Sequence, residues 1–143
     1  MTVGTGSFHA CTEGEVVATV RKALDRGAGG RIITPNVDIL RQARTDAAVR
    51  AYLAAADFVV ADGMPLVWAS RLAGTPLPER VCGSSLIWSL AQGLGVDGRS
   101  IYVLGGEPAP VPHAALAPAG GAPAYLASPG RPPAPRSRAF RTV

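Results

Sequence analysis

Asp62 follows a short apolar run, Phe58 to Val60, and precedes a glycine and a helix start marked by Pro65. In α/β enzymes, reactive groups lie at the carboxyl ends of buried parallel strands. A carboxylate held there can remove a proton from a hydroxyl within hydrogen-bond reach. The same aspartate also suits a helix N-cap, which from the sequence alone is the commoner role. Because the two roles are compatible, Asp62 is the candidate general base.

Arg80 lies in a loop that Pro76 and Pro78 stiffen. A guanidinium held by a stiff loop can bind a phosphate through two parallel hydrogen bonds. A solvated surface arginine is the commoner fate of such a residue. Ser84 and Ser85, at the start of the next helix, can add hydroxyls to an anion site or simply cap that helix. The block from Asp62 onward therefore predicts an enzyme with an anionic substrate.

Two further strand ends carry suggestive residues. Thr34 and Asn36 can orient a substrate through a hydroxyl and an amide, and turn or cap chemistry explains them equally well. Gly105 and Gly106 follow the strand 100–104 and would let a diphosphate approach backbone N–H groups. Without a full glycine fingerprint, a simple turn is the alternative. In one parallel sheet, all three strand ends would meet at the carboxyl edge.

These residues need a frame of alternating helices and strands. Strands are expected at 31–34, 57–61 and 100–104. Helices are expected between Thr12 and Gly27, over 37–44 and 46–56, between Pro65 and Gly74, and from Ser84 or Ser85 to about Gly93. Thr12 and Glu15 form a capping box before the first helix. This order predicts a Rossmann-like α/β fold, with parallel strands joined by right-handed helical crossovers.

The aromatic and histidine side chains receive no catalytic role from the sequence. Tyr52 is expected to face the core, and Trp68 and Trp88 are expected to face it wholly or partly. His9 and His113 have no carboxylate or cysteine at motif spacing. Neither a metal site nor a bound cofactor is therefore predicted.

The chain has 143 residues and 48% hydrophobic residues, which suits a globular domain. No apolar stretch reaches the roughly 20 residues that span a bilayer, and no secretory signal opens the chain. A cytoplasmic location follows, with Cys11 and Cys82 as reduced thiols. Most of the net charge of +4 falls in residues 107–143, and residues 1–106 lack a basic stripe. No nucleic-acid partner is therefore expected.

Residues 107–143 differ in character from residues 1–106. They hold 9 of the 13 prolines and show neither helical nor strand periodicity. Such a segment cannot bury enough apolar surface to offset chain entropy, so we expect disorder there and an incomplete α/β domain over 1–106. Two explanations remain open: a natural Pro/Arg-rich tail, or a change of reading frame shortly after Gly106. The abrupt loss of pattern favours the second.

Four blocks in order resemble the bacterial glycosyltransferases of the WecG/TagA/CpsF family. They are T-x-N-x-D-x-L at Thr34 to Leu40, ADG-x-P at Ala61 to Pro65, ERV-x-G at Glu79 to Gly83, and a strand with two glycines at Ile101 to Gly106. The resemblance covers about residues 12–106. It implies transfer of N-acetylmannosamine, its uronic acid or a related sugar from UDP to a polyprenyl-diphosphate-linked acceptor. Such enzymes serve cell-surface polysaccharide synthesis, which implies a peripheral position at the inner face of the membrane.

The resemblance also implies roles for individual residues. Asp62 matches the aspartate that would deprotonate the acceptor hydroxyl in an inverting, metal-independent displacement. Thr34 and Asn36 match pocket residues, and Arg80 matches an arginine that contacts phosphate. The Gly105–Gly106 turn matches the start of the nucleotide-sugar site.

The chain departs from the family pattern in two respects. Ser85 stands where the family usually has an aspartate, and residues 107–143 do not continue the family's later blocks. We therefore expect this chain by itself to be inactive. The alternative functions are a non-catalytic remnant or interaction domain, and a generic nucleotide-binding module. The latter needs a glycine fingerprint and an acid about 20 residues on, which are missing. An exposed strand edge also predicts self-association.

Overall fold

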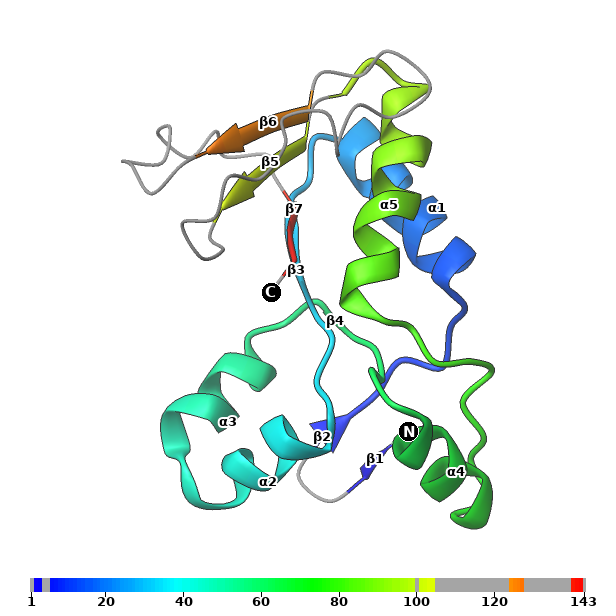
Figure 1. Cartoon of the computed structure of the whole chain (residues 1–143), viewed down its shortest axis with the longest axis vertical. Helices are drawn as coiled ribbons and strands as arrows, with labels where there is room; N and C mark the ends of the chain where they lie inside the picture. Colours follow the sequence, from blue (N-terminus) through cyan, green and yellow to red (C-terminus); the bar gives the residue numbers. More distant parts are fainter. Residues whose placement is uncertain (1, 4–5, 100, 105–123, 128–139, 143) are drawn as a thin grey trace.

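A computed structural model describes residues 2–3, 6–99, 101–104, 124–127 and 140–142 (Figure 1). Its helices are α1 (Glu13–Asp25), α2 (Val37–Thr45), α3 (Ala47–Ala54), α4 (Met64–Leu72) and α5 (Gly83–Gly95). Its strands are β1 (Thr2–Val3), β2 (Gly6–Ser7), β3 (Gly30–Ile33), β4 (Phe58–Val59), β5 (Ile101–Leu104), β6 (Ala124–Ala127) and β7 (Phe140–Thr142). The helices expected over 37–44 and 46–56 are present as α2 and α3.

Strand β3 lies at the centre of a parallel sheet in the order β4-β3-β7. Ile32 is paired with Phe58 of β4, and Gly30 is paired with Phe140 of β7. The crossover from β3 to β4 runs through α2 and α3, as a parallel pair requires. The predicted α/β class, with a parallel sheet and flanking helices, is confirmed.

The two isoleucines of β3 point into different layers of the core. Ile32 packs with α1 and α5, and its side chain is fully buried. Ile33 packs with α2 and α3 on the other face. This alternation follows from the period of two along a strand. Since helices cover both faces, β3 is buried on both sides (Figure 1).

Strand β5 differs from the expectation of a single sheet. It pairs with β6 in a separate two-stranded parallel sheet, while β7 occupies the edge of β3 that β4 leaves open. The expected common edge for all three strand ends is therefore found for β3 and β4 alone. Of residues 107–143, the structure describes β6 and β7, both as short strands. The remainder of the predicted disorder lies outside the described residues.

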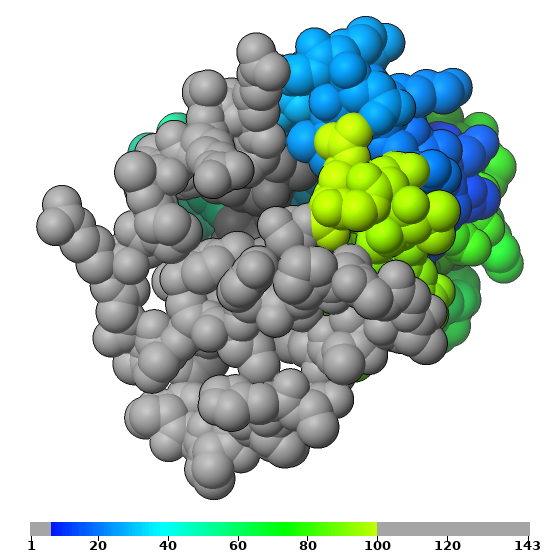
Figure 2. All heavy atoms as spheres, turned by 90° about the horizontal axis from the view of Figure 1, so that it is seen from above, coloured from blue at the N-terminus to red at the C-terminus, as the bar shows by residue number. Residues whose placement is uncertain are grey.

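Two ion pairs join α1 to the turn that follows α5. Arg21 Nη2 lies 2.7 Å from Asp97 Oδ1, and Arg99 Nη2 lies 2.5 Å from Asp25 Oδ1. Figure 2 shows the ends of α1 (blue) and α5 (yellow-green) side by side. At the other end, the predicted capping box is present. There the Thr12 N–H donates to Glu15 Oε2 at 2.7 Å.

Three aromatic residues expected to face inward are exposed. Trp68 is 56% exposed, Trp88 45% and Tyr52 37%. The buried face of α4 consists of Leu66, Val67 and Ser70, which leaves Trp68 on the opposite side. Tyr52 lies beneath the guanidinium of Arg31, whose Cζ is 5.3 Å from the ring centroid. The expectation of core packing is wrong for these rings.

Among the described residues, no helix is long and apolar enough to cross a membrane.

Candidate functional site

Three segments converge at the carboxyl ends of β3 and β4. The Asp62 N–H donates to Pro35 O at 3.2 Å, which continues the β3–β4 pairing beyond the strands. The Val81 N–H donates to Ala61 O at 3.0 Å and joins the loop after α4 to the same edge. Segments 34–36, 61–63 and 79–83 are therefore neighbours in space, although about 45 residues of chain separate the first from the last.

Gly83 lies directly against Thr34. A Cβ on residue 83 would be 2.8 Å from Thr34 Oγ1, closer than ordinary side-chain contacts allow. A glycine at the start of α5 thus permits the backbone to approach the end of β3. This contact fixes the first turn of α5 beside the candidate site.

Asp62 does not cap α4. The N-cap is Gly63, with φ 154° and ψ 135°, and no side chain accepts a hydrogen bond from the first turn. Helix α4 begins at Met64, so Asp62 lies one position too early to reach the free N–H groups. The backbone at Gly63 is in a region that suits glycine, and it turns the chain between Asp62 and the helix. The capping interpretation of Asp62 is wrong.

The Asp62 side chain is half-buried and has no polar partner among the residues that the structure describes. Within residues 7–99, each of the other carboxylates accepts a hydrogen bond or joins an ion pair. They are Glu13, Glu15, Asp25, Asp38, Asp46, Asp57, Glu79 and Asp97. Burial of an unpaired carboxylate is unfavourable, so such groups are kept where they serve a ligand or a reaction. This difference singles out Asp62 among the described carboxylates.

Arg80 lies between two anchored neighbours. Glu79 Oε1 accepts a hydrogen bond of 2.5 Å from the Glu13 N–H at the start of α1. Val81 is 1% exposed and joins the core. The Arg80 side chain is exposed and makes no hydrogen bond or ion pair with described residues. Its backbone is thus fixed close to Asp62, while its guanidinium is free to meet an anion.

Asn36 and Thr34 differ in whether their side chains form hydrogen bonds. Asn36 is the N-cap of α2, and its Oδ1 accepts from the Ile39 N–H at 3.0 Å, which confirms the cap interpretation. The half-buried Thr34 hydroxyl makes no hydrogen bond with described residues. Gly105 and Gly106, the predicted nucleotide contacts, lie outside the described residues.

Ser84 and Ser85 are not helix caps. The N-cap of α5 is Cys82, without a side-chain bond, and both serines lie inside the first turn. The Ser85 hydroxyl donates to Glu13 Oε2 at 2.8 Å, and Ser89 donates to the same carboxylate. Ser85 therefore joins α5 to α1 and is not free to bind a substrate anion.

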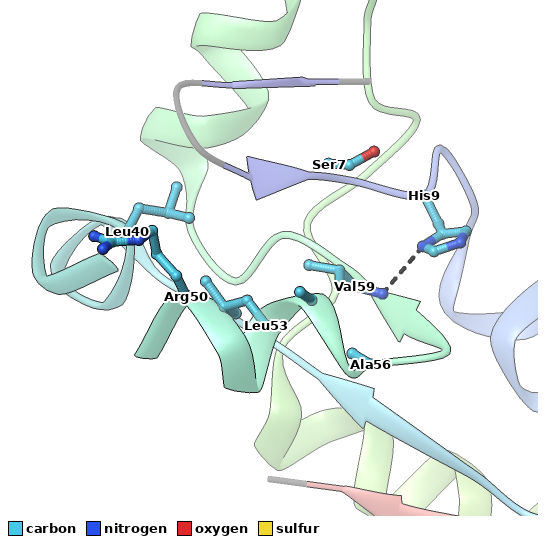
Figure 3. Close-up of a pocket in the computed structure, with 8 residues that line it drawn as sticks. Ser7, His9, Leu40, Arg50, Leu53, Ala56 and Val59 are labelled. Atoms are coloured by element: carbon cyan, nitrogen blue, oxygen red, sulfur yellow. Dashed lines mark hydrogen bonds between the residues drawn. The ribbon is translucent and has the colours of Figure 1, made fainter. Parts of the chain in front are cut away.

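His9 has a structural role that the sequence did not indicate. Its ring Nδ1 accepts from the Val59 N–H at 3.1 Å (Figure 3). The backbone N–H of His9 donates to Val59 O at 2.8 Å. Sequence spacing gives no signal for a partner 50 residues away. A pocket of about 280 Å³ lies beside His9, and residues of β2, α2, α3 and β4, together with Ala56, complete its lining. None of the predicted site residues lines this pocket, so it is separate from the Asp62 site.

The two cysteines are free thiols, as expected. Burial raises the pKa of the Cys11 thiol, and the carboxylates of Glu15 and Glu79 raise that pKa further. Across the residues that the structure describes, no three His, Cys, Asp or Glu side chains gather as a metal centre requires.

Comparison with known proteins identifies the family. A profile of the glycosyl transferase WecG/TagA/CpsF family matches residues 1–117. A curated relative from Bacillus spizizenii is 39% identical over 67 residues, which cover 47% of this chain and 26% of the relative. That relative is named N-acetylglucosaminyldiphosphoundecaprenol N-acetyl-beta-D-mannosaminyltransferase. The matched region thus spans about a quarter of the relative's length.

The family profile covers all three segments that meet around Asp62. It also covers every described helix and the central β3–β4 pair. The chain therefore belongs to the WecG/TagA/CpsF family of glycosyl transferases.

Proposed function

We propose that this chain forms the acceptor-activating part of a glycosyltransferase. The enzyme transfers an N-acetylmannosamine-type sugar from UDP to N-acetylglucosamine linked to a polyprenyl diphosphate. Family membership supports the reaction class, and the name of the Bacillus relative supports the sugar and the acceptor. The observation that carries the proposal is the Asp62 carboxylate at the carboxyl edge of the sheet, which has no polar partner within the described part of the chain.

Asp62 acts as the general base in this proposal. Its carboxylate takes the proton of the acceptor hydroxyl as the hydroxyl oxygen bonds to the anomeric carbon of the donor sugar. The bond from that carbon to the UDP oxygen breaks, and UDP leaves with the electron pair. Attack from the face opposite UDP inverts the anomeric configuration. A carboxylate without another partner is available for this proton.

In this proposal, Arg80 and Thr34 bind and orient the substrates. The free guanidinium of Arg80 meets the charge of a diphosphate, which becomes more negative as the sugar bond breaks. The Thr34 hydroxyl orients the reacting sugar beside Asp62. Asn36 has its amide nitrogen left for a substrate, since only its oxygen caps α2. Gly105 and Gly106 remain the expected contacts of the nucleotide.

The acceptor places this reaction at a membrane surface. A polyprenyl chain stays in the bilayer, and its diphosphate and sugar lie in the headgroup region. The protein would therefore act as a peripheral enzyme of cell-surface polysaccharide synthesis.

A transfer assay tests the function. The chain would be extended by the region of the Bacillus relative that follows the matched segment, then incubated with UDP-N-acetylmannosamine and a short polyprenyl-diphosphate N-acetylglucosamine. We expect the extended protein to form the disaccharide lipid and the chain alone to form little. Absence of product from a folded extended protein that still binds UDP would support the non-catalytic alternative.

A further inference from the structure

Helix α4 carries large apolar side chains on its solvent face. Met64, Trp68 and Leu72 are 39%, 56% and 90% exposed. Their spacing of four residues places them in one file along the helix. We call these three residues the α4 stripe.

The other face of α4 is also apolar, since it buries Leu66 and Val67. A surface helix normally presents charged or polar residues to water, and an all-apolar helix is normally buried. Helix α2 follows that rule, because Asp38, Arg41 and Arg44 are exposed. The α4 stripe is therefore unusually apolar for a surface exposed to water.

The charge within α4 itself has one sign. Arg71 is the single charged residue in residues 63–78, and it is exposed beside Leu72. The exposed Arg80 follows in the loop, while the neighbouring Glu79 is held at the start of α1. A surface with apolar residues, a tryptophan and free arginines complements the headgroup region of an anionic bilayer.

We propose that the α4 stripe docks this protein on the surface of an anionic lipid membrane. A stable dimer interface needs about 20–30 residues on each side, and three large side chains with one arginine fall far short of that. Shallow insertion of a few apolar side chains, together with attraction of arginine to anionic lipids, suits a stripe of this size. Trp68 is suited to the interface, because its ring is apolar and its N–H can stay hydrated.

The position of the stripe fits the chemistry, and this step rests on the proposed function. Helix α4 begins two residues after Asp62, and its nine residues extend about 13 Å. Docking through α4 would hold Asp62 close to the membrane surface. A lipid-linked diphosphate sugar would present its hydroxyl at that level.

Vesicle binding tests the docking surface independently of catalysis. The full chain would be sedimented with vesicles of equimolar phosphatidylglycerol and phosphatidylcholine, or of phosphatidylcholine alone, without polyprenyl lipid or UDP-sugar. We expect binding to the anionic vesicles to fall about tenfold or more in the Trp68→Ser, Leu72→Ser double variant. Arg71→Gln should lower it about fivefold.

The chain offers a matched control on α5 and its C-cap. Trp88 and Val96 are 45% and 83% exposed, so Trp88→Ser, Val96→Ser removes similar side chains from another surface. This variant should bind vesicles as the unchanged protein does. Equal loss in both double variants would overturn the proposal, as would a lack of binding by the unchanged protein.

Tryptophan fluorescence gives a second measurement with conservative variants. In Trp88→Phe, Trp68 is the remaining tryptophan, and its emission should shift to the blue on addition of anionic vesicles. In Trp68→Phe, the emission of Trp88 should stay unchanged. If Trp68→Ser, Leu72→Ser instead converts an oligomer to a monomer in analytical ultracentrifugation and vesicles shift neither emission, a second copy covers the stripe and the membrane proposal is wrong.

Discussion

Thr34 Oγ1 lies 2.8 Å from the point that a Cβ on residue 83 would occupy, so the side chain at the end of β3 lies directly against the backbone of the first turn of α5. The contact joins two segments that the sequence separates by nearly 50 residues. Since Asp62 bonds through its backbone to Pro35, the same contact also fixes the surroundings of the candidate base.

Gly83→Ala should destabilise the protein by about 1–3 kcal/mol, because the new methyl group would overlap Thr34 and push α5 from the sheet. Urea unfolding measures the loss. Gly14→Ala is the control, since nothing lies within 4 Å of its added methyl group. The control should be neutral or slightly stabilising, as alanine favours helices. Equal stability of the two variants would contradict the close contact.

Glu79→Ala should cost about 1 kcal/mol of folding free energy, because the start of α1 loses the acceptor for the Glu13 N–H. Glu79→Gln keeps a carbonyl oxygen at that position and should cost less. Thermal unfolding of both variants checks the order. If alanine is tolerated as well as glutamine, the bond between Glu79 and α1 does not hold the Arg80 loop.

Acid should weaken the contact of α1 with α5. The hydrogen bond from Arg21 lowers the pKa of Asp97. Because the folded pKa is lower than the unfolded one, the stabilisation is present above the unfolded value, near 3.9, and is lost as pH falls through the folded value. Asp97→Asn should therefore be less stable than the unchanged protein at pH 7, and the difference should shrink below about pH 4.

Salt provides a check on the same pair. The Arg21 side chain is 43% exposed, so high sodium chloride at pH 7 should reduce the difference caused by Asp97→Asn. Unfolding curves of both proteins at pH 7 and below pH 4, each at low and at high sodium chloride, measure the difference in stability. A difference that is independent of pH and salt would mean that Asp97 stabilises α5 in another way.

Local chemistry explains what the sequence predicted. The capping box of Thr12 with Glu15 depends on residues three positions apart, so the spacing predicted it. The cap at Asn36 was one of two alternatives that the sequence left equal. The buried strands β3 and β4 followed from apolar runs. Long-range contacts explain where the sequence-based predictions were wrong. Trp68 is exposed because other residues of α4 fill the core. Strand β5 pairs with β6, and β7 pairs with β3, through contacts between segments far apart in the sequence.

The candidate site shows the same difference between what local sequence predicts and what long-range contacts decide. The sequence predicted that the segments of Thr34 and Asp62 meet, because parallel strands end at one edge. It did not predict that Asp62 lacks a polar partner among the described residues, since that depends on where each neighbouring side chain points. The partner of His9 was missed for the same reason. Whether Asp62, Thr34, Asn36 and Arg80 carry the reaction stays a prediction.

The direct test of Asp62 is sugar transfer by Asp62→Asn in the extended protein. The amide is nearly isosteric, and the unchanged side chain has no hydrogen bond to described residues that it could lose, so the free energy of unfolding should change by less than about 0.5 kcal/mol. Asp46→Asn, at an exposed carboxylate outside the four family blocks, is the control and should transfer normally, since asparagine can also cap α3. We expect Asp62→Asn to bind UDP-sugar but to lose about 10²–10⁴ in turnover, since an amide cannot accept the acceptor's proton. Near-normal turnover by a folded Asp62→Asn protein would contradict the account.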